Sequence, residues 1–111
     1  ILGTKYLMEG PVYPGKLAPL GIKTITPNAD ERSSINTLIF DHLVFNRVTR
    51  EDRSTLLNVI ERLHDEHQCE AVVLGCTELP LILNDTISPL PTLDSTRLLA
   101  RAAIKRAATR D

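Results

Sequence analysis

The sequence predicts an α/β fold, a three-layer lobe in which a short parallel sheet of about four strands is flanked by helices. Apolar runs typical of strands alternate along the chain with segments whose apolar residues recur at helical spacing. The EAVVL segment at 70–74 is almost continuously apolar, as expected for a parallel strand that is covered on both faces. The 111 residues, 42% of them hydrophobic, suffice for one domain with an ordinary core.

The first quarter of the chain is expected to contain two strands. Residues 1–3 resemble the end of a strand, and residues 4–10 resemble the loop that follows it. Residues 12–20 are expected to hold a short helix, interrupted by prolines and a glycine. The alternating, β-branched IKTIT segment at 22–26 predicts the second strand.

Two longer helices are predicted next. Asn28 is a suitable N-cap for a helix that extends to about residue 44, because acidic residues then lie in its first turn. Thr49 is expected to cap a second helix that extends to about residue 67, with an apolar stripe along one face.

The remaining elements alternate again. The strand at 70–74 leads through a Gly-Cys-Thr turn into a short helix at 78–83. Two prolines within 87–93 restrict any strand there to a short edge strand. Asp94 or Ser95 is expected to cap a last helix that extends to about residue 108.

Bulk composition excludes several classes of function. The net charge of −1 provides no basic surface for nucleic acid or for a membrane, and 4% aromatic residues offer no stacking platform for bases. No apolar run approaches the ~20 residues of a membrane span, and no signal peptide is evident. Two cysteines do not form a disulfide scaffold, and a strand between Cys69 and Cys76 would separate them by about 20 Å. We therefore expect a reduced, cytoplasmic protein with free thiols.

The first residues, ILGTKYLMEG, contain no initiator methionine and begin with an apolar pair that enters a Gly-Thr turn. This pattern resembles the end of a strand whose beginning lies outside the chain. We expect a fragment truncated at its N-terminus.

Polar side chains follow three of the expected strands. Thr4 follows the first strand, residues 26–28 follow the second, and Cys76, Thr77 and Glu78 follow the strand at 70–74. Ligands of open parallel sheets gather at the carboxyl ends of strands. These groups therefore suit a small polar ligand, and no glycine-rich phosphate loop occurs among them.

Cys76 has three possible roles: a reactive thiol, a metal ligand or a buried structural cysteine. Its position before a helix predicts a lowered pKa and hence a reactive thiolate, with Glu78 tuning the thiol or capping the helix. A zinc site would need His64, His67 and Cys69 to join it. The intervening strand carries Cys76 away from them, so we expect no metal.

The segment GCTELPLIL at 75–83 resembles the second cysteine motif of the aspartate/glutamate racemase superfamily. The similarity extends to three further segments: LGT with YLMEG at 2–10, PNADERSSINTLIFDHL at 27–43 and PTLDSTRLLARAA at 91–103. Together these segments cover nearly the whole chain. The resemblance implies that residues 1–111 are the second, C-terminal lobe of such a protein.

The resemblance also implies a function: racemisation of aspartate or glutamate without pyridoxal phosphate, metal or other cofactor. Inversion at the α-carbon needs a base on one face and an acid on the other, and family members use two thiols, one from each lobe. By this analogy Cys76 is one catalytic thiol, and Thr77 helps to hold the substrate carboxylate. Thr4 belongs to the same wall of the substrate pocket, and Glu78 is a supporting partner of the thiol.

The first lobe, which would supply the opposite acid or base, has no counterpart in the chain. We therefore expect the 111 residues alone to be inactive, and to pair as a homodimer through the apolar face that this lobe would cover. Two alternatives remain open. One is a related cysteine enzyme of the hydantoin racemase, maleate isomerase or arylmalonate decarboxylase type, and the other is a non-catalytic α/β binding module.

Overall fold

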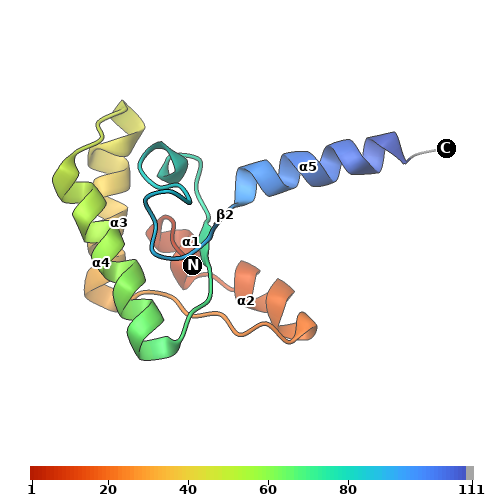
Figure 1. Cartoon of the computed structure of the whole chain (residues 1–111), viewed down its shortest axis with the longest axis horizontal. Coiled ribbons are helices and arrows are strands. Elements are labelled where there is room, and N and C mark those ends of the chain that lie inside the picture. Colours follow the sequence, from red (N-terminus) through yellow and green to blue (C-terminus); the bar gives the residue numbers. More distant parts are fainter. Residues whose placement is uncertain (110–111) are drawn as a thin grey trace.

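The computed structural model describes residues 1–109, in which helices and strands follow the order of an α/β domain (Figure 1). The α-helices are α1 (Lys5–Glu9), α2 (Val12–Leu17), α3 (Ala29–Asp41), α4 (Arg50–His67) and α5 (Ser95–Ala108). Short 3₁₀ helices occupy Ala18–Leu20, Leu43–Phe45 and Leu79–Leu81. The strands β1 (Val72–Leu74) and β2 (Thr92–Asp94) form a two-stranded parallel sheet. The predicted α/β class is thus confirmed.

The expected sheet of about four strands is wrong for the described residues. Leu2 forms one isolated parallel bridge with Leu74, so residues 1–3 add a single pair to the sheet. Residues 22–26 are extended but form no strand. The amino group of Ile1 donates a hydrogen bond to the carbonyl oxygen of Ile25 at 2.8 Å, and a ladder needs several such pairs.

Helix starts agree with the sequence analysis better than strands do. Asn28 caps α3 in a complete capping box with Glu31, and Thr49 caps α4 by accepting a hydrogen bond from the Asp52 N–H at 3.0 Å. Asp94 caps α5 as expected. The expected loop at 4–10 is wrong, because this segment forms α1.

Four predicted elements were too long. Helix α3 ends at Asp41, before the expected residue 44, and the short helix expected at 78–83 is one 3₁₀ turn. The strand expected at 70–74 contains only Val72–Leu74, and the edge strand expected at 87–93 is confined to Thr92–Asp94. Pro80 lies in the 3₁₀ turn and Pro91 directly precedes β2. Both elements are short because proline donates no backbone hydrogen bond.

The hydrophobic core lies between the sheet and the pair α3 and α4, which run side by side in Figure 1. Its members are the large apolar side chains of these elements and of the segments beside them. Examples are Ile35, Ile39, Leu56, Ile60, Leu74 and Leu83. Val72 and Leu74 lie in this core, whereas Val73 between them is only half-buried. The described helices therefore cover one face of the sheet, and the expected three-layer arrangement is incomplete.

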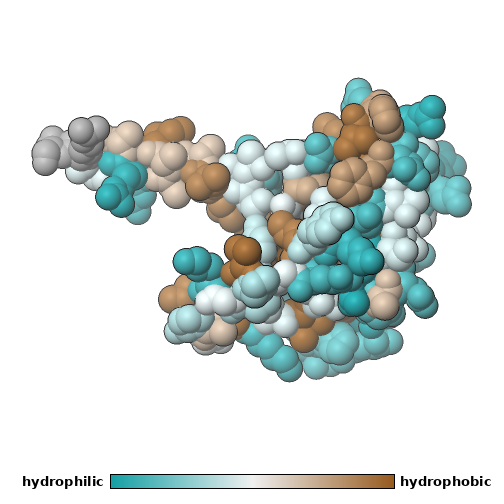
Figure 2. Space-filling model, turned by 180° about the vertical axis from the view of Figure 1, so that it is seen from behind, coloured by the Kyte–Doolittle hydropathy of each residue, from teal (hydrophilic) through white to brown (hydrophobic). Residues whose placement is uncertain are grey.

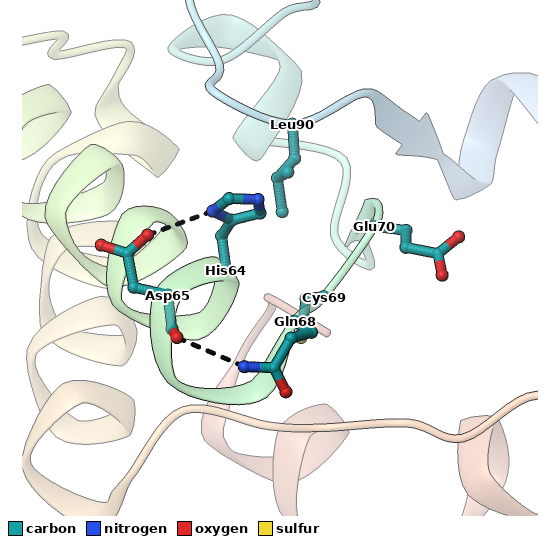
Figure 3. Close-up of a pocket in the computed structure, with 6 residues that line it drawn as sticks. All are labelled: His64, Asp65, Gln68, Cys69, Glu70 and Leu90. Carbon is teal, nitrogen blue, oxygen red and sulfur yellow. Dashed lines mark hydrogen bonds and ion pairs between the residues drawn. The ribbon is translucent and has the colours of Figure 1, made fainter.

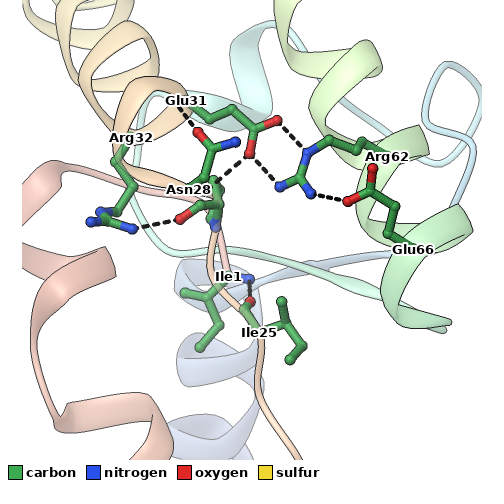
Figure 4. Close-up of polar contacts among 8 residues, drawn as sticks. Ile1, Ile25, Asn28, Glu31, Arg32, Arg62 and Glu66 are labelled. Atoms are coloured by element: carbon green, nitrogen blue, oxygen red, sulfur yellow. Dashed lines mark hydrogen bonds and ion pairs between the residues drawn. The ribbon is translucent and has the colours of Figure 1, made fainter.

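An ion-pair network joins α3 to α4 at the surface of the core (Figure 4). The Arg62 guanidinium donates two hydrogen bonds to Glu31 and one to Glu66, the last at 2.6 Å. Glu31 also accepts the Asn28 N–H at 2.9 Å. Hydrogen bonding to Arg62 lowers the pKa of the Glu31 carboxyl below its ordinary value.

Helix α5 projects from the rest of the molecule, as Figure 1 shows. None of its residues is buried, although it contains several large apolar side chains. Across residues 1–109, no helix combines the length and the apolar character that crossing a membrane would require.

Candidate functional site

The carboxyl end of β1 lies beside the first residues of the chain. The Leu2 N–H donates to the Val73 carbonyl oxygen at 2.9 Å, and the Gly75 N–H donates to the Leu2 carbonyl oxygen at 2.8 Å. These two bonds enclose the isolated bridge described above. In this parallel register Thr4 and Cys76 each follow the bridge by two residues. Both therefore leave the sheet at the same edge.

Two glycines allow these turns to approach one another. A Cβ atom added to Gly3 would lie 2.8 Å from Leu7 Cδ2, and one added to Gly75 would lie 2.6 Å from the same atom. Gly75 also faces the carbonyl oxygen of Leu2, at 3.0 Å from such a Cβ. The Leu7 side chain thus occupies the space between both turns, which only glycine leaves open.

Cys76 is half-buried and is one of two free cysteines among the described residues. Burial raises the pKa of its thiol above the ordinary value, and the Glu78 carboxylate adds to this effect. Hydrogen bonds from the Leu79 and Glu78 backbone N–H groups act in the opposite direction but are weaker in total. The expected lowering of the pKa is therefore wrong, because a three-residue 3₁₀ helix provides little dipole to offset burial.

The neighbours of this thiol differ in exposure. Thr77 is exposed to solvent, while Thr4 and Glu78 are half-buried. The Thr4 hydroxyl accepts the Leu7 N–H at 3.4 Å as the cap of α1, which leaves its own hydrogen available for donation. The Glu78 side chain makes no capping hydrogen bond.

Three residues that support this edge were not identified from the sequence. Leu7 fills the space between the turns, and the Ser95 hydroxyl donates to the Leu74 carbonyl oxygen at 3.0 Å. The Asn36 side chain accepts the Lys5 N–H at 2.8 Å and so ties α1 to α3. One signal was present in the sequence: Leu-Gly-Thr at 2–4 and Leu-Gly-Cys at 74–76 repeat one pattern.

The hollows of the described structure lie elsewhere. One is a surface pocket of about 540 Å³ at the opposite end of β1, lined by Cys69, Glu70 and Leu90 together with the end of α4 (Figure 3). A second, larger hollow lies between residues 21–25, the end of α4 and β1, and is also lined by Cys69. Neither hollow is lined by Thr4 or Cys76.

The zinc alternative gains no geometric support. Within residues 1–109, no three His, Cys, Asp or Glu side chains gather closely enough to hold a metal ion. His64 donates or accepts a hydrogen bond with Asp65 at 3.1 Å, and Cys69 lies near it at the far end of the strand from Cys76.

Comparisons with known proteins identify the family of the chain. The sequence profile of the family described as Asp/Glu/Hydantoin racemase matches residues 1–103. A crystal structure of a Yersinia pestis protein, provisionally assigned as an Asp/Glu racemase, superposes with a TM-score of 0.89 at 32% sequence identity, over 97% of this chain. The structure of an aspartate racemase homologue from Pyrococcus horikoshii superposes with a TM-score of 0.90 at 31% identity, over 96% of this chain.

The match covers 47% of the Yersinia chain and 46% of the Pyrococcus chain. The present chain thus spans about half the length of these relatives. The family profile nevertheless spans residues 1–103, and each superposition covers nearly all of this chain. The chain belongs to the Asp/Glu/hydantoin racemase family.

Proposed function

We propose that the chain supplies one half of the active site of a cofactor-independent racemase that acts on aspartate or glutamate. Cys76 is the acid/base on one face of the substrate α-carbon. Thr77 and Thr4 bind the α-carboxylate, and Glu78 adjusts the protonation of the thiol. No metal or organic cofactor takes part in this proposal.

One observation carries the proposal. The hydrogen bonds between Leu2 and β1 bring the Gly3-Thr4 turn and the Gly75-Cys76-Thr77 turn to one edge of the sheet. Thr4, Cys76 and Thr77 thereby lie at adjacent strand ends, where ligands of parallel sheets bind. Hydroxyl and backbone N–H donors suit a carboxylate, and a thiol suits reversible proton transfer.

The raised pKa of Cys76 defines its resting form. Burial keeps the thiol protonated at neutral pH, so Cys76 is the member of the pair that delivers a proton to the carbanion. The group that removes the α-hydrogen from the opposite face must then be a base outside residues 1–109. It follows that the isolated chain has no racemase activity.

The test uses a longer protein that contains this chain together with a second lobe. Incubation with L-aspartate or L-glutamate in deuterated water should exchange the α-hydrogen and produce the D-isomer, both measurable by NMR and chiral chromatography. Replacing Cys76 with serine should reduce the rate at least a thousandfold, as expected for loss of an acid/base group. Cys69→Ser is the matched control and should retain full activity.

The same assay separates the related enzymes. Exchange at the C5 hydrogen of a 5-substituted hydantoin, without exchange in either amino acid, would replace the proposed substrate with a hydantoin. Maleate conversion or loss of carbon dioxide from an arylmalonate would indicate the other two reaction types. Activity of the isolated 111-residue chain on aspartate would refute the half-site. Normal activity of Cys76→Ser would support the non-catalytic alternative for this chain.

A further inference from the structure

The backbone just before Cys76 is held from both sides. The peptide plane that joins Leu74 to Gly75 carries one N–H group and one carbonyl oxygen, which point in opposite directions. Its N–H donates to the Leu2 carbonyl oxygen at 2.8 Å, and its carbonyl oxygen accepts the Ser95 hydroxyl at 3.0 Å. Because β1 lies between residues 1–3 and β2, these two bonds fix the plane from opposite sides of the strand.

Gly75 makes this restraint important for the thiol. Glycine has more conformational freedom than any other residue, so a small rotation of the plane before Gly75 redirects Cys76. A stiffer residue does not fit here, because a Cβ atom on Gly75 would lie 2.6 Å from Leu7 Cδ2. The direction of the chain at Cys76 therefore depends on how firmly the preceding peptide plane is held.

Ser95 reaches this plane because β2 ends where α5 begins, as Figure 1 shows. The register pairs Leu74 with Asp94, and Ser95 is the next residue and the first of α5. The Asp94 side chain accepts the N–H groups of Thr96 and Arg97 at 3.1 and 3.3 Å. Asp94 thus caps the helix, and the Ser95 hydroxyl bonds to the sheet instead.

A purely structural role for Ser95 would be to attach α5 to the sheet. Helix α5 projects from the rest of the molecule (Figure 2), and none of its residues is buried. Leu74, in contrast, is only 1% exposed, and its carbonyl oxygen accepts the hydroxyl in a partly buried place. Attachment predicts that loss of the hydroxyl affects α5 alone, whereas positioning predicts an effect at Cys76.

We propose that Ser95 is a positioning residue for Cys76 and acts through the peptide plane between Leu74 and Gly75. Together with Leu2 it sets the direction in which Cys76 leaves the sheet. The inference rests on the proposed function, in which Cys76 transfers a proton at the substrate α-carbon. A displacement of about 1 Å between reacting groups reduces a rate about a hundredfold, so such a restraint matters for catalysis.

The first test follows the thiol itself. Alkylation of Cys76 by iodoacetamide is measured against pH in the 111-residue chain with Cys69→Ser, which leaves Cys76 as the reacting cysteine. Ser95→Ala should move the midpoint of the profile to lower pH by about half a unit. Burial is the largest cause of the raised pKa of this thiol, and a loosened turn exposes it to water.

Two variants serve as controls. Ser95→Thr keeps a hydroxyl group and should keep the alkylation profile of the parent. Ser88→Ala removes a bond of the same kind in the loop before β2, where the Ser88 hydroxyl donates to the Leu90 carbonyl oxygen at 2.6 Å. It should leave the profile unchanged. Circular dichroism and urea titration should show a folded chain for every variant, so that the response of the thiol separates them.

The second test uses the longer protein that contains a second lobe. Ser95→Ala should lower kcat for aspartate or glutamate at least tenfold and change KM by less than about threefold, because a displaced acid/base group acts mainly in the transition state. Ser95→Thr should keep the kcat of the parent.

The two tests fail in distinguishable ways. An alkylation profile of Ser95→Ala equal to that of the parent would overturn the positioning role, whatever the racemase assay shows. Equal shifts in Ser95→Ala and Ser88→Ala would overturn it as well, because they would indicate a general loosening of the fold. If the longer parent protein racemises neither amino acid, the proposed function fails, and alkylation still decides whether Ser95 positions Cys76.

Discussion

Residues 1–94, here called the body, and helix α5 are stabilised by different interactions. Seventeen large apolar side chains are buried in the body, and an ion-pair network and glycine turns fix the elements around them. Helix α5 has a well-formed N-cap at Asp94 and good helix formers, yet it buries none of its side chains. The comparison indicates that the body owes its structure to tertiary packing, whereas α5 depends on local signals and on whatever covers it.

The largest difference should appear when one side chain is shortened in each part. Ile60→Ala in the fully buried centre of α4 should lower the free energy of unfolding by about 3 kcal/mol, through lost burial and a cavity. Leu99→Ala in α5 should change the free energy of unfolding by less than about 0.5 kcal/mol. Urea titration followed by circular dichroism gives both values. Equal losses would show that α5 packs on its own body.

A smaller effect is expected at the paired turns of the body. Gly75→Ala should destabilise the fold by about 2 kcal/mol, because the new methyl group meets Leu7 and a backbone carbonyl. Leu7→Ala in the same chain should recover part of this loss, since it removes the closer contact. A double-mutant cycle from denaturant titrations measures the coupling. Strict additivity of the two changes would rule out Leu7 as the cause.

The ion pair between Glu31 of α3 and Arg62 of α4 should contribute less to the free energy of unfolding than the contact of Gly75 with Leu7. The pKa of Glu31 is lowered in the folded state, so its stabilisation is present above the ordinary value near 4.5 and is lost as pH falls through the folded value. Arg62→Met should cost about 0.5 kcal/mol at pH 7, as expected for a partly exposed pair. The same substitution should lower the free energy of unfolding by less at acidic pH, where Glu31 is protonated. Melting curves at pH 7 and pH 3 would show the convergence, and a constant difference would contradict it.

The last prediction concerns the thiol rather than stability. Because Glu78 raises the pKa of Cys76 by its negative charge and hydrogen bond, Glu78→Gln should lower that pKa toward its ordinary value. The rate of alkylation by iodoacetamide, followed against pH in a Cys69→Ser background, should then rise at lower pH than in the parent. Glu70→Gln, at the other end of the strand, is the matched control. If the pH dependence of alkylation is the same in Glu78→Gln as in the parent, Glu78 does not shift the pKa of Cys76.

Much of this molecule could be predicted from local sequence signals. The caps at Asn28, Thr49 and Asp94 marked three helix starts, because each side chain satisfies backbone N–H groups only a few residues away. The cysteine motif at 75–83 indicated the family, which the profile and the structures confirm. The roles assigned to Cys76, Thr77, Thr4 and Glu78 stay predictions.

What the sequence determined by itself was therefore the α/β class, the main helices and the family. The tertiary structure decided the number of strands, since a ladder depends on which distant segments meet. Residues 22–26 have strand-like composition but form no strand among the described residues. It also decided the direction in which the pKa of Cys76 is shifted, because burial and the Glu78 charge outweigh the local backbone donors. Long-range contacts set both outcomes, and no spacing along the chain records them.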